Sequence, residues 1–169
     1  MRKFVFFTFV YFLSISLPFQ SLADKVTLKF HTMLPMPSNT IANFVKPWFN
    51  KIKNESNNEI LAEFYPSMQL GGKPSQLVDQ VREGVVDVIW TVAGYTPGRF
   101  PRLSVFELPF MPTNAEVTTQ AVQEFVETIG AEDLKDYKIL AVHVHSPGKI
   151  HTKNTLIKSL DDFQGLKLR

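Results

Sequence analysis

The chain has 169 residues, enough for one domain with a sizeable hydrophobic core. Its 18 basic side chains nearly balance its 16 acidic ones, so it lacks the excess of positive charge that attracts proteins to nucleic acid. It contains no cysteine, which excludes a disulfide framework and thiolate metal sites.

The N-terminal residues have the pattern of a secretory signal peptide. Arg2 and Lys3 form a short basic region, Phe4 to Leu17 is apolar, and Ser21 to Ala23 supplies the small residues that a signal peptidase recognises. We therefore expect residues 1–23 to be a signal peptide that is cleaved at that site. An uncleaved membrane anchor is the alternative, but the apolar run is too short to span a bilayer comfortably. Cleavage would remove two basic residues and no acid, leaving a mature chain with no net charge.

Three short apolar stretches are predicted strands, at Val26 to His31, Ile60 to Tyr65 and Val85 to Trp90. The third is rich in β-branched residues and has Asp87 as its one charged residue, a composition that favours a central strand covered on both faces of a sheet. Ligands of such sheets bind outside the carboxyl ends of the strands, so the loop that begins at Trp90 is a predicted wall of a site. A buried strand followed by a rigid loop without a function would give the same composition.

Helices are predicted between these strands. Ile41 to Ile52 carries apolar residues at helical spacing, and Pro47 predicts a kink within that helix. Pro74 suits the first turn of a second helix, which Gly84 would end. The order strand, helix, strand, helix, strand predicts a parallel α/β sheet.

The remaining sequence predicts a third helix and two more strands. Thr113 and Glu116 form a capping box for a helix that ends at Gly130. Lys138 to His145 is a predicted fourth strand, and Lys149 to Lys153 is its predicted neighbour. The last four residues would begin another strand. Because a domain rarely stops there, we expect the chain to be the first part of a longer protein.

Three histidines raise the question of an enzyme. His143 and His145 lie two apart on a predicted strand and so face the same side, and His151 could meet them across a hairpin. Such a trio is a conceivable zinc site and supports one alternative, a secreted metal-dependent hydrolase. The simpler interpretation is a set of half-exposed histidines, because no H-E-x-x-H or G-x-S-x-G motif accompanies them. No pattern requires an enzyme, and we expect neither a metal nor a cofactor.

The chain also carries five longer motifs in a fixed order: LKFHTMLP, YPSMQLGG, LVDQVREGVVDVIW, GYTPGRFP with VFELPFM, and SLDDFQGLKLR. Together they resemble the solute-binding subunit of TRAP transporters, the DctP-like family. The resemblance runs along the whole predicted mature chain, and several independent motifs in one order make it specific.

The resemblance implies an α/β fold of the periplasmic-binding-protein type, with two lobes and a cleft between them. Residues 24–137 would form the first lobe and residues 138–169 the incomplete start of the second, so the fold would be truncated. It further implies a periplasmic receptor that captures an organic acid, a carboxylate, and delivers it to the membrane subunits of a TRAP transporter. The solute-binding protein of an ATP-driven importer shares this architecture and is a further alternative.

The resemblance also implies the ligand-binding residues. The family motif G-L-K-[IL]-R carries a carboxylate-binding arginine, which is Arg169 here. Lys149 stands where many members have arginine, and lysine offers a point charge rather than a planar fork. Trp90 and Thr91 fall where the first lobe lines the cleft. Tyr95 falls just beyond the end of the same predicted strand, and Met33 lies in the first of the five motifs. The predicted ligand-binding residues are Arg169, Lys149, Trp90, Thr91, Tyr95 and Met33.

Overall fold

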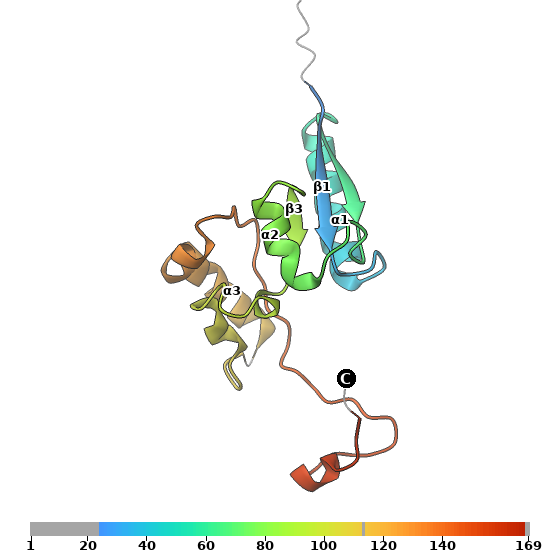
Figure 1. Ribbon diagram of the computed structural model, residues 1–169, viewed down its shortest axis with the longest axis vertical. Coiled ribbons are helices and arrows are strands. Elements are labelled where there is room, and N and C mark those ends of the chain that lie inside the picture. The colour runs from blue at the N-terminus through green and yellow to red at the C-terminus, as the bar shows by residue number, and fades with distance from the viewer. Residues whose placement is uncertain (1–23, 113, 168–169) are drawn as a thin grey trace, which may run out of the picture.

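The computed structural model describes residues 24–112 and 114–167. Its centre is a sheet of three strands, β1 (Val26–Thr32), β2 (Ile60–Tyr65) and β3 (Val88–Trp90), in the order β2-β1-β3 (Figure 1). β1 pairs in parallel with both neighbours, which confirms the predicted parallel α/β arrangement. The central strand of the described sheet is β1, so the prediction of a central third strand is wrong.

The third strand is also shorter than predicted, because its first residues complete the preceding helix. That helix, α2 (Leu77–Arg82), follows a 3₁₀ turn that begins at Pro74, as the sequence predicted. Gly84 has φ +73° and donates its N–H to the Val81 carbonyl at 3.2 Å, while the Val85 N–H reaches the Gln80 carbonyl at 2.9 Å. This pair of bonds is a Schellman motif, which confirms the predicted helix end and keeps Val85 out of the strand ladder.

The helical segment between β1 and β2 begins with a π-helical turn, Ile41–Val45, and continues as α1 (Lys46–Glu55). The Lys46 N–H donates to the Ile41 carbonyl, five residues back. Pro47 follows directly and has no N–H to donate, so the irregularity that the sequence predicted at Pro47 takes the form of this wider turn.

α1 covers one face of the sheet through a cluster of aromatic and aliphatic side chains. Phe49 lies 5.8 Å from Phe30 of β1 and 5.4 Å from Phe64 of β2, measured between ring centroids, and both pairs are close to perpendicular. Such edge-to-face contacts are favourable for aromatic rings. The fully buried Ile41 belongs to the same cluster, so the first turn of the helical segment is anchored to the sheet as well.

A second hydrophobic cluster forms on α3 (Ala115–Glu127), where Val122 and Val126 are buried. The helix begins one residue later than the capping-box prediction, because the Asn114 side chain accepts the Val117 N–H at 3.0 Å; Thr113 lies outside the described residues. No helix within the described ranges is long and apolar enough to cross a membrane.

The inner face of α3 is narrower than the sequence predicted. Val117 and Ile129 were expected to face inward but are 64% and 67% exposed. The α-helix also ends at Glu127, and a 3₁₀ segment, Ile129–Leu134, replaces its predicted last turn. A hydrophobic residue at helical spacing can lie at the edge of a buried stripe, so spacing alone overestimates the buried width.

The strands predicted at residues 138–145 and 149–153 are not formed in the described structure. A strand needs a neighbour that supplies ladder hydrogen bonds, and no described segment pairs with either range. Val142 and Val144 nevertheless pack against the α3 cluster, whereas His143 between them is exposed. Figure 1 shows that the chain beyond this segment extends away from the sheet and α3.

Truncation of Phe49 tests the α1 cluster. Phe49→Ala should lower the free energy of unfolding by about 3–5 kcal/mol, because the ring packs against aromatic side chains of two strands. Phe44→Ala is the matched control on the π-helical turn, since Phe44 is 51% exposed, and should change stability by less than about 1 kcal/mol. Guanidinium unfolding followed by circular dichroism measures both, and equal losses would contradict the described packing.

Candidate ligand-binding site

The candidate site lies where the carboxyl ends of β1 and β3 meet at one edge of the sheet. The register pairs Thr32, the last residue of β1, with Trp90, the last residue of β3. Parallel strands bring their carboxyl ends to the same edge, which is where ligands of open α/β sheets bind. The loop that follows Trp90 therefore occupies the position that the sequence predicted for a site wall.

Thr32 joins the two strand ends. Its side chain is completely buried, and its hydroxyl donates to the Trp90 carbonyl at 3.2 Å. The same oxygen accepts the Leu34 N–H at 3.2 Å. One hydroxyl therefore fixes where the loops after β1 and β3 begin. Nothing in the local sequence distinguished Thr32 from an ordinary strand threonine, because its partner is 58 residues away.

The indole of Trp90 contacts His143 from the segment after α3. Its Nε1–H donates to His143 Nε2 at 3.0 Å, and the two rings lie edge to edge with centroids 5.8 Å apart and planes 28° from parallel. Indole nitrogen can only donate, so His143 Nε2 must accept. The His143 ring is therefore neutral in this arrangement and carries its hydrogen on Nδ1.

His31 is a second histidine at this edge, and it is completely buried. Its Nδ1 lies 2.7 Å from Gln80 Oε1, and Gln80 Nε2 donates to the Gly71 carbonyl at 3.2 Å. This chain of bonds links β1 to α2 and to the loop after β2. Among the described residues, His31 Nε2 and the buried Thr91 hydroxyl have no hydrogen-bond partner. Buried polar atoms of this kind are commonly satisfied by ordered water or a bound molecule.

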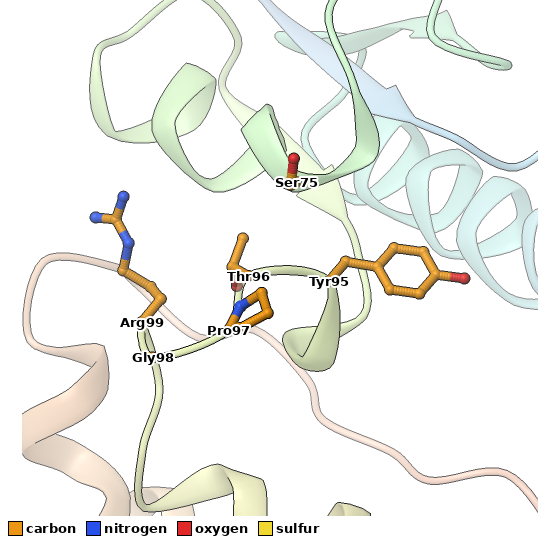
Figure 2. Close-up of a pocket in the computed structure, with 6 residues that line it drawn as sticks. All are labelled: Ser75, Tyr95, Thr96, Pro97, Gly98 and Arg99. Carbon is orange, nitrogen blue, oxygen red and sulfur yellow. The ribbon is translucent and has the colours of Figure 1, made fainter.

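A shallow pocket of about 430 Å³ lies next to this edge, between the loop after β3 and the turn that precedes α2. Figure 2 shows Ser75 facing Thr96 and Pro97 across the pocket, while the Tyr95 ring and the Arg99 guanidinium extend in opposite directions from the loop. Of these residues the sequence had singled out only Tyr95, which is exposed.

An ion pair between Arg99 and Asp79 joins the pocket loop to α2. Arg99 Nη2 lies 2.6 Å from Asp79 Oδ1, and Arg82 Nη2 lies 2.9 Å from the same oxygen. The charge of Arg99 is therefore already partly compensated by a residue of α2. This contact explains how a loop rich in glycine and proline keeps one position over the sheet edge.

A buried carboxylate holds the next part of that loop. Asp133 has only 2% of its side chain exposed, and it accepts hydrogen bonds from the Arg102 backbone at 2.6 Å and the Arg102 guanidinium at 2.7 Å. Burial alone would raise the pKa of Asp133, but the hydrogen bonds from Arg102 outweigh it and lower the pKa below its usual value. The charged form of Asp133 therefore stabilises the fold.

The structure brings only some of the predicted ligand-binding residues to this edge. Trp90 and Thr91 lie at the end of β3, and Met33 begins the loop after β1. Lys149 is exposed and lies in the segment that extends away from the sheet. Arg169 lies outside the described residues, so its predicted role remains a prediction.

The three histidines of the alternative metal site do not come together. His143 binds Trp90, and the His145 Nδ1–H donates to the Ser146 carbonyl at 2.6 Å. His151 is exposed in the extending segment. Within the part of the chain that the structure describes, no three histidine, aspartate or glutamate side chains are grouped so that they could hold a metal ion.

A parallel sheet whose strand ends and following loops meet at one edge is an α/β arrangement in which small molecules commonly bind at that edge. Residues 31–169 match the family DctP, described as bacterial extracellular solute-binding protein, family 7, and the chain belongs to this family. A curated relative, the outer membrane transporter protein TsaT of Comamonas testosteroni, is 25% identical over 155 residues, which cover 90% of this chain and 45% of the relative.

Solved structures of TRAP solute-binding proteins are also similar to this chain. One from a marine metagenome, described as specific for aromatic acid ligands and holding 3-hydroxybenzoate, is 66% identical with a TM-score of 0.79, over 84% of this chain and 44% of that one. One from Rhodoferax ferrireducens with copurified benzoate is 53% identical with a TM-score of 0.78, over the same shares. One from Bordetella bronchiseptica with mandelate is 30% identical with a TM-score of 0.69, over 83% and 45%. The chain thus spans less than half the length of these relatives.

Thr32→Val tests the junction of β1 and β3. The substitution keeps the shape but removes both hydrogen bonds of the hydroxyl, so the buried Trp90 carbonyl and Leu34 N–H lose their partner. We expect the free energy of unfolding to fall by about 1–3 kcal/mol in urea titrations. Thr27→Val is the control, because Thr27 is exposed on the same strand. An unchanged stability in Thr32→Val would contradict the junction.

Asp133→Asn tests the buried carboxylate through pH. Because the pKa of Asp133 is lowered in the folded state, its stabilisation is fully present above the ordinary aspartate pKa and is lost as the pH falls through the lower folded value. At pH 7 the variant should be less stable than the wild type by about 1–3 kcal/mol. The difference should shrink below about pH 4. Urea titrations across pH 3–7 measure it, and a pH-independent difference would contradict the assignment.

Proposed function

We propose that this chain is part of an extracytoplasmic solute receptor that captures an organic acid for a TRAP-type transporter. The observation that carries the proposal is its 66% identity, over 84% of the chain, to a TRAP solute-binding protein that holds 3-hydroxybenzoate. Membership of the DctP family supports the same class of receptor. Nothing in the described site suggests a reaction, and the proposed role is binding rather than catalysis.

The proposed ligand class is an aromatic carboxylate. The similar structures that hold 3-hydroxybenzoate, benzoate and mandelate all have a ligand with one aromatic ring and one carboxylate. In this chain, the rings of Trp90 and His143 lie side by side and nearly parallel, which forms a flat aromatic surface at the carboxyl edge of the sheet. A flat ring packs well on such a surface.

The carboxylate would be held by Arg169 and Lys149. A guanidinium can form two parallel hydrogen bonds with a carboxylate, whereas an ammonium contributes a single point of charge. Arg169 would therefore fix the orientation of the acid group, and Lys149 would add attraction. Trp90, Thr91, Tyr95 and Met33 would surround the rest of the ligand from the first lobe.

In the proposed receptor, residues 1–23 export the protein, residues 24–137 belong to the first lobe and residues 138–169 begin the second. Closure of the two lobes about a hinge would trap the ligand before its transfer to the membrane subunits of the transporter. An ATP-driven importer could use the same architecture, and the genes for the membrane subunits would separate the two. The hydrolase alternative loses its basis, because its three histidines are not brought together in the described structure.

Calorimetry on the complete receptor tests this proposal. Benzoate and hydroxybenzoates should bind with micromolar or tighter dissociation constants, whereas benzamide, which has the ring but no charge, should not bind measurably. Arg169→Ala should weaken benzoate binding by about 30-fold or more, since it removes one partner of a charge pair. Lys167→Ala, in the same motif, is the control and should change affinity less than about threefold. Benzamide binding as tightly as benzoate would contradict the proposal.

A further inference from the structure

The contact between Trp90 and His143 also determines which nitrogen of the imidazole carries its hydrogen. Because the indole N–H donates to Nε2, the imidazole has one free N–H, on Nδ1. No side-chain hydrogen bond within residues 24–112 and 114–167 uses that Nδ1. His143 therefore offers a single uncharged donor at the candidate site.

The His143 ring is held from two directions. Val142 and Val144 on either side of it pack into the α3 cluster, and the Val144 N–H donates to the Thr119 hydroxyl at 3.1 Å. These contacts turn the His143 side chain toward the exposed face, where the Trp90 indole binds its edge. Trp90 is itself anchored, because Thr32 binds its carbonyl. A donor held in this way loses little freedom when it binds a ligand, which is the condition for discrimination between similar ligands.

Resting on the function proposed above, we propose that His143 is a specificity-determining residue that recognises an oxygen substituent on the ligand ring through its Nδ1–H, and that Trp90 is its positioning residue. The acid group of the ligand has charged partners in Arg169 and Lys149, so an uncharged single donor is better matched to a second, uncharged acceptor. A phenolic hydroxyl oxygen on the ring is such an acceptor. The proposed ligand is therefore a hydroxylated aromatic acid rather than a plain one.

The physical reason for discrimination is the cost of an unpaired donor. When the receptor closes on a ligand without a ring oxygen, the Nδ1–H loses water and gains no acceptor. Sites built around such a hydrogen bond reject analogues that lack the matching group. The hydroxylated acid should therefore bind at least about tenfold more tightly than benzoate.

The test measures affinity ratios on the complete receptor by calorimetry, with benzoate, 3-hydroxybenzoate and 4-hydroxybenzoate. In the wild type, at least one hydroxylated acid should bind about tenfold or more tightly than benzoate. His143→Leu should reduce that ratio to below about threefold, whatever its effect on the affinity for benzoate itself. His143→Asn, whose amide N–H₂ lies close to the place of Nδ1, should retain part of the preference. His145→Leu, on the same exposed side, should leave the ratio unchanged.

Two outcomes overturn the inference but leave the proposed function standing. The first is a wild type that binds benzoate as tightly as it binds the hydroxylated acids. The second is a His143→Leu variant whose ratio of affinities is the same as in the wild type, including the case in which all three acids lose affinity equally. A wild type that binds none of the three acids would instead overturn the proposed function. Circular dichroism of each variant shows whether it is folded.

Nitrogen NMR of the imidazole tests the role of Trp90 separately. In the wild type, the ¹⁵N shifts should show the hydrogen of His143 on Nδ1. Trp90→Phe keeps an aromatic ring but removes the N–H, so the hydrogen should be shared between both nitrogens and the preference for hydroxylated acids should fall. A His143 tautomer that is unaffected by Trp90→Phe would contradict the positioning role.

Discussion

Parallel pairing of β1 with both of its neighbours is the constraint on which the candidate site depends. It places the last residues of β1 and β3 side by side, and the buried hydroxyl of Thr32 joins them. The loops that follow these strands consequently begin at the same edge. α1 supports this arrangement from one face of the sheet through the aromatic cluster around Phe49.

The loop after β3 is positioned by charge rather than by hydrophobic packing alone. Asp79 of α2 binds Arg99 at the pocket, and the buried Asp133 binds Arg102 a few residues later. Each carboxylate ties the loop to a different helical segment. A loop held at two points in this way can present Tyr95 and its neighbours at a defined place, although its own sequence is rich in glycine and proline.

Local structure was largely predictable from the sequence. The positions of β1 and β2, the helix start at Pro74 and the helix end at Gly84 depend on turn chemistry and spacing within a few residues, and all four are confirmed. The predicted strand at residues 138–145 is wrong for the described structure. Strand formation requires a neighbouring strand that supplies hydrogen bonds. The alternation of apolar and polar residues from Val142 to His145 indicates only that the valines face inward and the histidines outward.

The contacts that build the candidate site join residues far apart in the chain, so spacing could not reveal them. Thr32 and Trp90 are 58 residues apart, and Trp90 and His143 are 53 apart. The sequence singled out His143, but as a member of a metal site rather than as the partner of an indole. The position of the third predicted strand identified the loop that begins at Trp90 as a site wall, and the family resemblance added Thr91 as a residue that lines the cleft.

A crystal structure of the complete receptor with a bound aromatic acid would show whether the ligand binds at the carboxyl edge of the sheet. We predict that the ring of the ligand lies against Trp90 at that edge, with its carboxylate hydrogen-bonded to Arg169. A ligand bound away from that edge, or an Arg169 side chain turned away from the acid group, would contradict it.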